Sequence, residues 1–280
     1  TELVQNGNFS ELGSDLILNG DFAEVGSDLI TNGDFATDSN WTLGTGWSIG
    51  ENKAVAVSGT ASKLQQTNPS LNGKSCKVTF TLSNYGGAGV LIVDFGSTSS
   101  SDIDADGTHI RYGTYDQNYF QLYKSSTFSG DVTNVIVQED GQDWTLGTGW
   151  SIGEDVAISD GSVGSITQSI LSADVFYKIR IKVTGNPTLL VFSSTSFYGD
   201  EAARTLKNGT HNYYLQAKVA AFSITNEGGD ACTITNISAE QLDPNDYWTL
   251  GTGWSIGADK AISTVTGSNS DITQSILTAG

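Results

Sequence analysis

The chain contains few residue patterns that could carry chemistry, and the clearest is the segment GWSIG at residues 46–50. It matches the G-x-S-x-G turn that exposes the nucleophilic serine of many hydrolases, and it recurs twice further along the chain. That turn requires a strand-to-helix junction in an α/β sheet, together with a histidine and an acid. The chain has two histidines and no α/β pattern. We therefore predict a glycine-bounded strand in which Trp47 and Ile49 face the core, and we expect no enzymatic activity.

An acidic stretch could bind a metal ion. Asp102, Asp104 and Asp106 alternate along the chain and are followed by Gly107. This is the pattern at the front of a calcium-binding loop, where alternate oxygens converge on the ion. The glutamate that such a loop has at its twelfth position is missing, because residue 113 is a glycine. Two interpretations stay open, a structural calcium site and a solvated acidic turn.

Aromatic side chains could bind a glycan by stacking on sugar rings. The tryptophans recur at the same place in each copy of a long repeat, and this favours core positions, because a buried tryptophan contributes a large apolar area. Tyrosines in the variable regions are better candidates for contact with a host-surface glycan. These candidates are Tyr112, Tyr115, Tyr119, Tyr198, Tyr213 and Tyr214.

The long repeat also defines the elements that must position these residues. The segment WTLGTGWSIG starts at residues 41, 144 and 248, so its copies lie 103 and then 104 residues apart. A period of this size indicates tandem copies of one domain. The predicted organisation is a head of residues 1–31, module 1 at 32–140, module 2 at 141–243 and an incomplete module 3 at 244–280.

Short segments that alternate apolar and polar residues fill the first two modules. Glycine, asparagine and aspartate turns separate these segments, and no segment shows a helical period. Seven or eight short strands per module predict an all-β fold of tandem antiparallel β-sandwiches of the jelly-roll type. Cys76 and Cys232 occupy unrelated positions in their modules, and we predict that both are buried free thiols.

The head contains a shorter repeat of 13 residues with the pattern Asn-Gly-x-Phe. Three copies stand at the N-terminal end of the chain, and module 1 can use the third, at residues 32–35, so two copies are spare and two modules lack an opening strand. We hypothesise that the spare strands, or a neighbouring copy of the chain, complete these modules by strand addition and build a head-to-tail filament. The alternative is a head that packs locally. The residues assigned to assembly are Asn6, Phe9, Asn19, Phe22, Trp248 and Trp254.

Three motifs together resemble the carbohydrate-binding-module-like jelly rolls: Asn-Gly-Asp-Phe at 32–35, Trp-x-x-Gly-x-Gly-Trp at 41–47, and a closing strand N-[VI]-x-[VA]. Such modules accompany secreted glycan-active enzymes and recur in bacteriophage virion fibres and decoration proteins; the tandem head resembles the phage versions. The resemblance covers residues 3–241. It implies a structural calcium near the first and last strands, with Asp34 and Asp140 as candidates. Modules 2 and 3 depart from the pattern, because no NGDF segment directly precedes their tryptophans.

The composition excludes several classes of partner. The net charge is −18, and we find no basic cluster among the 13 lysines and arginines along the sequence. This argues against nucleic acid and anionic membrane surfaces, and no apolar run is long enough to span a membrane. We expect other copies of the chain and host-surface glycans as partners, and a location outside the cell or on a virion surface.

These observations favour a non-catalytic structural or adhesive protein of a fibre or virion surface. The alternative is an array of carbohydrate-binding modules from a secreted polysaccharide-active enzyme.

Overall fold

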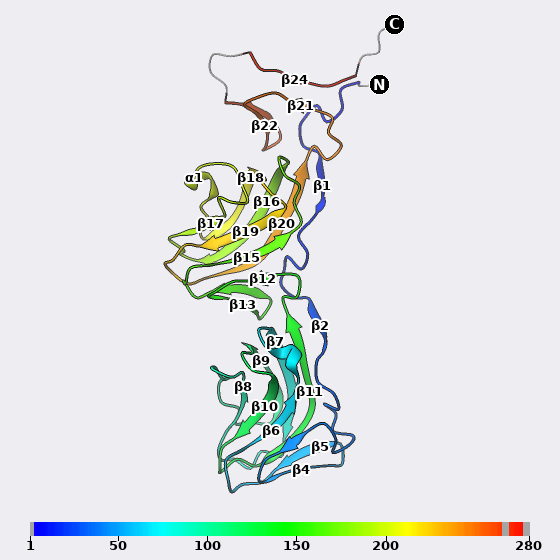
Figure 1. Cartoon of the computed structure of the whole chain (residues 1–280), viewed down its shortest axis with the longest axis vertical. Helices are drawn as coiled ribbons and strands as arrows, with labels where there is room; N and C mark the ends of the chain where they lie inside the picture. Colours follow the sequence, from blue (N-terminus) through cyan, green and yellow to red (C-terminus); the bar gives the residue numbers. More distant parts are fainter. Residues whose placement is uncertain (1–2, 265–268, 277–280) are drawn as a thin grey trace. The chain divides into compact units, whose positions relative to one another are not determined.

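The computed structural model describes residues 3–264 and 269–276 (Figure 1). Apart from one short helix, α1 (Glu201–Arg204), and one 3-10 turn, η1 (Pro69–Leu71), its described elements are β-strands. The chain divides into two compact units. Unit 2 consists of residues 22–142 and 151–155, and unit 1 contains the described residues of 1–21, 143–150 and 156–280. Among the described residues, no helix has the length and apolar character needed to cross a membrane.

Module 1, in unit 2, is a sandwich of two antiparallel sheets. One sheet has the strand order β4–β5–β11–β7–β9, with β2 beside β11, and the other has the order β3–β6–β10–β8. The strands are β2 (Val25–Asp28), β3 (Thr42–Leu43), β4 (Trp47–Gly50), β5 (Lys53–Ala56), β6 (Ser62–Thr67), β7 (Ser75–Ser83), β8 (Leu91–Asp94), β9 (Gly107–Thr114), β10 (Tyr119–Lys124) and β11 (Gly130–Asp140).

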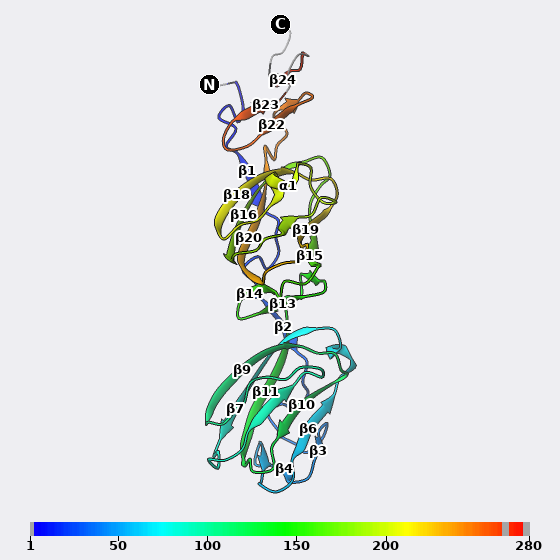
Figure 2. The same cartoon turned by 90° about the vertical axis from the view of Figure 1, so that its left-hand side faces the viewer.

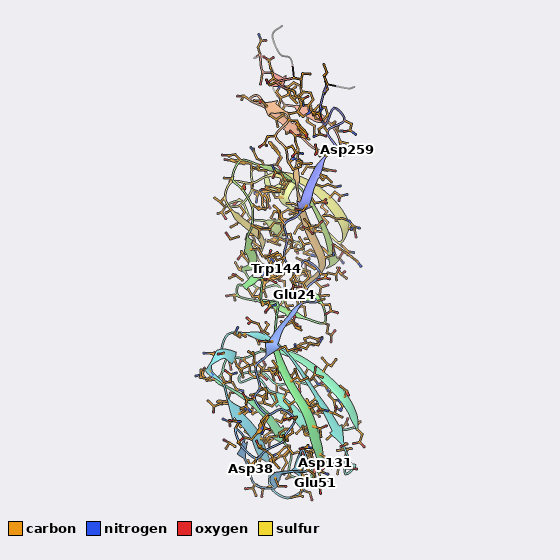
Figure 3. All side chains as sticks on the ribbon, turned by 90° about the vertical axis from the view of Figure 1, so that its right-hand side faces the viewer. Glu24, Asp38, Glu51, Asp131, Trp144 and Asp259 are labelled. Carbon is orange, nitrogen blue, oxygen red and sulfur yellow. The ribbon has the colours of Figure 1, made fainter. Side chains whose placement is uncertain are left out.

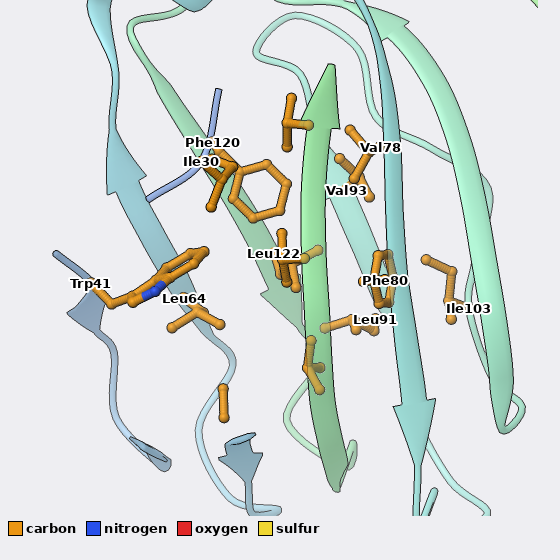
Figure 4. Close-up of a cluster of buried hydrophobic side chains, with 14 of the residues drawn as sticks. Ile30, Trp41, Leu64, Val78, Phe80, Leu91, Val93, Ile103, Phe120 and Leu122 are labelled. Atoms are coloured by element: carbon orange, nitrogen blue, oxygen red, sulfur yellow. The ribbon is translucent and has the colours of Figure 1, made fainter. Parts of the chain in front are cut away.

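The core of module 1 lies between these two sheets. Along β7, Val78, Phe80 and Leu82 are buried while the residues between them are partly exposed, as expected for a strand with one face in the core. Figure 4 shows Phe80 in the same cluster as Val93 of β8 and Leu122 of β10, which come from the opposite sheet. Two apolar sheet faces therefore pack against each other, and each fully buried phenylalanine stabilises the module by about 2 kcal/mol.

Module 2, in unit 1, repeats this architecture. One sheet contains β14–β20–β16–β18 in this order, with β1 beside β20, and the other has the order β12–β15–β19–β17 (Figures 1 and 2). The strands are β1 (Leu12–Asp15), β12 (Thr145–Leu146), β14 (Val156–Ser159), β15 (Gly164–Ser169), β16 (Phe176–Gly185), β17 (Leu190–Phe192), β18 (Gly209–Gln216), β19 (Ala221–Asn226) and β20 (Cys232–Leu242). Strand β13 (Trp150–Gly153) precedes β14 in the chain. The two modules confirm the predicted fold of tandem antiparallel β-sandwiches.

Module 3 has only the opening part of this fold among the described residues. Its strands form two separate two-stranded sheets, β21–β24 and β22–β23. Their bounds are β21 (Thr249–Leu250), β22 (Trp254–Ile256), β23 (Ala261–Ser263) and β24 (Ile272–Thr273). The predicted module boundaries stay predictions, although β2 shows that part of the head belongs to the sheet of module 1.

The two cysteines are free and buried, as predicted. Burial raises the pKa of Cys76 to about 12 and that of Cys232 to about 11. Both side chains therefore stay protonated at neutral pH, and they fill space in the core of their modules.

Candidate functional site: three clamps for the N-terminal repeats

Each Asn-Gly-x-Phe repeat of the head forms a tight turn. The asparagines and phenylalanines of all three repeats have left-handed backbone conformations, with φ between 45° and 60°. In the first and third repeats the phenylalanine N–H donates to the asparagine carbonyl, at 3.0 and 3.1 Å. The head does contain strands that recur every 13 residues, β1 and β2, but they lie between the Asn-Gly-x-Phe segments, which are turns and not strands. A left-handed phenylalanine costs about 1 kcal/mol, so the surrounding module must stabilise each turn.

The first tryptophan of every module holds one of these turns. Its indole Nε1 donates a hydrogen bond to the backbone carbonyl of the repeat asparagine. The pairs are Trp41 with Asn32 at 2.9 Å, Trp144 with Asn19 at 3.1 Å and Trp248 with Asn6 at 3.1 Å. The only polar atom of each indole is thus used to bind the head.

A glutamine of every module binds the residue just before that asparagine. Its side-chain amide accepts a hydrogen bond from the backbone N–H of this residue and donates one to its carbonyl, as a neighbouring strand would. The pairs, with the two distances in that order, are Gln66 with Thr31 at 2.9 and 2.8 Å, Gln168 with Leu18 at 3.1 and 2.6 Å, and Gln274 with Gln5 at 2.7 and 2.9 Å. Each tryptophan–glutamine pair is termed a repeat clamp below.

The aromatic packing of the clamps is also repeated. Phe35 and Trp41 have ring centroids 5.0 Å apart at an interplanar angle of 36°, and Phe9 and Trp248 have centroids 5.1 Å apart at the same angle. Phe22, in the second repeat, is fully buried. Modules 1 and 3 therefore hold their repeats with the same geometry, although module 3 has fewer described strands.

The glycine of the repeat allows the turn to reach the last strand of the module. Val135 N–H donates to the Gly33 carbonyl at 2.9 Å in module 1, and Ile237 N–H donates to the Gly20 carbonyl at 2.8 Å in module 2. A Cβ added at Gly33 would lie 2.0 Å from the Val135 carbonyl oxygen, and one at Gly20 would lie 2.2 Å from that of Ile237. No side chain fits at either position.

An aspartate just before the second and the third turn extends this contact. Asp28 Oδ1 accepts hydrogen bonds from the N–H groups of Ile30 and Val137, both at 3.0 Å. Asp15 Oδ1 does the same for Ile17 at 3.0 Å and Ala239 at 2.9 Å. The carboxylate thus continues the pairing of β2 with β11, and of β1 with β20, where the head backbone leaves the sheet.

The repeats serve the modules in reverse order. The third repeat occupies the clamp of module 1, as the sequence predicts, and the second and first repeats occupy those of modules 2 and 3. The residues assigned above to assembly therefore make these contacts within one chain: Asn6 and Phe9 contact Trp248, and Asn19 contacts Trp144. Residues 3–35 leave no repeat unbound for the strand addition to a second copy that was hypothesised.

The tryptophans of modules 1 and 2 lie in the core, as predicted. Trp41, Trp47, Trp144 and Trp150 are each less than 9% exposed. In module 3, Trp248 and Trp254 are only partly buried and line a cavity of about 450 Å³. The cavity also has polar walls, which include Asp174 and Gln216 of module 2.

The tyrosines predicted to contact a glycan do not form one site. Tyr115 was predicted wrongly, because its ring is fully buried with its centroid 4.9 Å from that of Phe95. Tyr213 is half-buried, with its hydroxyl bonded to the Thr205 carbonyl. Tyr198 is 44% exposed and donates to Asp174 at 3.2 Å.

The other three tyrosines lie on strands. Tyr119 is half-buried at the start of β10. Tyr112 on β9 and Tyr214 on β18 pack against Gly153 and Gly257, the last residues of two WTLGTGWSIG copies. Their side chains therefore support neighbouring backbone within their own units.

The aspartates predicted to bind calcium are not grouped by the fold. Among the described residues, no three His, Cys, Asp or Glu side chains are placed to hold a metal ion. Asp106 accepts the Tyr85 N–H at 2.8 Å, Asp34 accepts the Ala36 N–H at 3.3 Å, and Asp102 and Asp104 are exposed. Burial raises the pKa of Asp140 to about 6 against the opposing effect of Lys77. Calcium binding stays a prediction.

The G-x-S-x-G segments lie on strands. Ser48 is in the middle of β4 and opposite Val55 of β5, so it is not on a strand-to-helix turn. The three clamp glutamines were not predicted. Their signal was available in the sequence, because Gln168 and Gln274 both stand in the segment ITQSI and Gln66 occupies the matching place in LQQT.

The sequence matches no model of a known protein family, and no curated protein matches it. Among solved structures, the N-terminal tandem CBM22 domains of Paenibacillus barcinonensis Xyn10C are similar over 83% of this chain and 98% of that chain. The identity is 9% and the TM-score is 0.29. A similarity this low carries no weight for the fold or for a ligand.

Proposed function

We propose that the chain is a non-catalytic structural and adhesive array, serving in a fibre or on a virion or other extracellular surface. Its modules present sheet faces to partners, and its head closes the modules. The repeat clamp supports this proposal most directly, since the same two side chains bind the same short turn in three modules. Residues built into such contacts serve cohesion.

The clamps explain why the head carries three repeats. In modules 1 and 2, the last strand has a neighbour on both sides at its start, but β5 and β14 end before β11 and β20 do. The head pairs with the remaining ends, β2 with residues 138–140 of β11 and β1 with residues 240–242 of β20, so these backbone groups are not left unpaired. Proteins that have to persist outside the cell gain from closed edges of this kind.

Hydrogen exchange of the full chain tests the proposal. We expect slow exchange for the amides of Thr31 and Leu18, which the clamp glutamines bind. Exchange at the rate of an unstructured segment would overturn the cohesive role of the head. Electron microscopy of the purified chain tests the fibre role, because end-to-end association of copies is expected for a fibre protein and single monodisperse chains would contradict it.

A second candidate function is a carbohydrate-binding array from a secreted polysaccharide-active enzyme. The observation that favours it is an exposed, polar sheet face on module 2.

A further inference from the structure

Strand β16 of module 2 carries three cations on its outward face. Its residues alternate, so that Ile179, Ile181 and their neighbours are buried while Lys178, Arg180 and Lys182 point away from the core. Alternate residues of a strand lie about 7 Å apart. The strand therefore presents a basic row that was not predicted from the sequence.

Neutral polar side chains flank Arg180 and Lys182 on both sides. The register places Asn212 of β18 and Ser238 of β20 beside Arg180, and Thr210 and Asn236 beside Lys182. At the other end, Lys178 lies between Tyr214 and Glu240. A shallow cavity of about 220 Å³ lies at the Arg180–Lys182 end and is lined by these two cations, Thr210 and Asn236. This surface is termed the basic face below.

The cations of the basic face have no ion-pair partner among the described residues. The ion pairs of the described chain all involve other lysines, such as Lys53, which lies 2.9 Å from Asp131 and 3.8 Å from Glu51. Figure 3 labels these two acidic residues. Arg180 and Lys182 are exposed and make no side-chain hydrogen bond in the described structure. In a chain with 13 cations and a net charge of −18, three unpaired cations on one strand form a marked local exception.

The matching face of module 1 has a different chemistry. Strand β7 has Lys77, Thr79 and Thr81 where β16 has its three cations. Thr79 lies between Ile110 and Ile136, which are 45% and 37% exposed. The same scaffold thus presents a basic, polar face in module 2 and a partly apolar face in module 1. The basic row is not required by the fold.

We infer that the basic face of module 2 binds an acidic polysaccharide. The guanidinium of Arg180 and the ammonium of Lys182 suit carboxylate or sulfate groups. Asn212, Asn236 and Thr210 can donate to and accept from sugar hydroxyls in the same plane. This inference rests on the proposed function in one respect, namely that exposed sheet faces are the surfaces that contact partners.

A sparsely charged polymer fits this surface better than a nucleic acid does. Double-stranded DNA carries one negative charge about every 1.7 Å along its axis. The negative charges on the remainder of this chain repel a polymer with so many charges. A sugar chain with isolated acidic groups meets the three local cations, while the more distant negative charges are screened within about 10 Å at moderate salt.

The test measures binding of the full chain to lightly carboxymethylated dextran, lightly sulfated dextran and neutral dextran at moderate salt. The variant is Arg180→Gln combined with Lys182→Gln, and the matched control is Lys207→Gln combined with Lys260→Gln, which removes two exposed cations that are not part of the basic row. We expect the wild type and the control to bind at least one acidic polymer, with weaker binding at higher salt. The variant should bind about tenfold more weakly, and dextran should not bind.

Three results would overturn the inference: no binding to either acidic polymer, equal binding by the variant, or tighter binding of single-stranded DNA than of both polymers. The two acidic polymers distinguish carboxylate from sulfate recognition. Hydrogen exchange of the head in the same variant separates this inference from the proposed function, because slow exchange at Thr31 and Leu18 without polymer binding would refute only the basic face.

Discussion

The repeat clamp of module 1 allows a quantitative prediction through Gln66. This side chain is 5% exposed and makes two hydrogen bonds to the backbone of Thr31. Replacing it with leucine keeps the size and removes both bonds. A net value of about 1 kcal/mol for each bond gives a loss of about 2 kcal/mol in the free energy of unfolding. For a domain of this size, that loss lowers the melting temperature by about 8 °C.

The assay is thermal unfolding of Gln66→Leu beside Gln65→Leu. Gln65 precedes Gln66 in β6, is half-buried, and makes no side-chain hydrogen bond among the described residues. The control therefore carries the same change of chemistry without loss of the clamp. Hydrogen exchange should also become faster at Thr31 in the first variant alone. If both variants have the same melting temperature and the Thr31 amide exchanges at the same rate in both, Gln66 does not hold the head and the clamp has no cohesive role.

Three other changes probe the head and the module cores. Gly33→Ala should cost several kcal/mol and release the third repeat, whereas Gly50→Ala, with no atom within 4 Å of the added Cβ, should melt like the wild type. Asp140, with its pKa raised by burial to about 6, stabilises the fold most when protonated; this contribution is complete below about pH 4 and is lost as the pH rises through 6. At pH 8 the free energy of unfolding of Asp140→Asn should therefore exceed that of the wild type by about 2 to 3 kcal/mol, and at pH 4 the two should be equal. If the difference between them were the same at both pH values, the assignment would be refuted. Cys76 and Cys232 should react with a thiol reagent only after denaturation, and fast labelling of the native chain would show that either thiol is accessible.

The predicted β-sandwiches follow from local signals in the sequence. Alternation along β7 and β16 identifies strands and their core faces, because side chains of a strand point alternately to the two sides of a sheet. The exact recurrence of Trp41, Trp144 and Trp248 identifies the modules and places the first two of these side chains in cores. The equal number of repeats and modules also indicates that the repeats complete the modules, and the place of the third repeat assigns it to module 1. The sequence does not say which of the other two repeats each remaining module binds.

The partner of each repeat was decided by the tertiary structure. Nothing in the sequence states that Asn6 meets Trp248, because the two residues are 242 positions apart and only the fold brings them together. The basic face arises in the same way. Arg180, Asn212 and Ser238 belong to three strands, and only the register of β16 with β18 and β20 places them side by side. Periodicity within a segment reports which residues are buried, whereas pairing between distant segments depends on the packed backbone, and it is this pairing that creates both the clamps and the basic face.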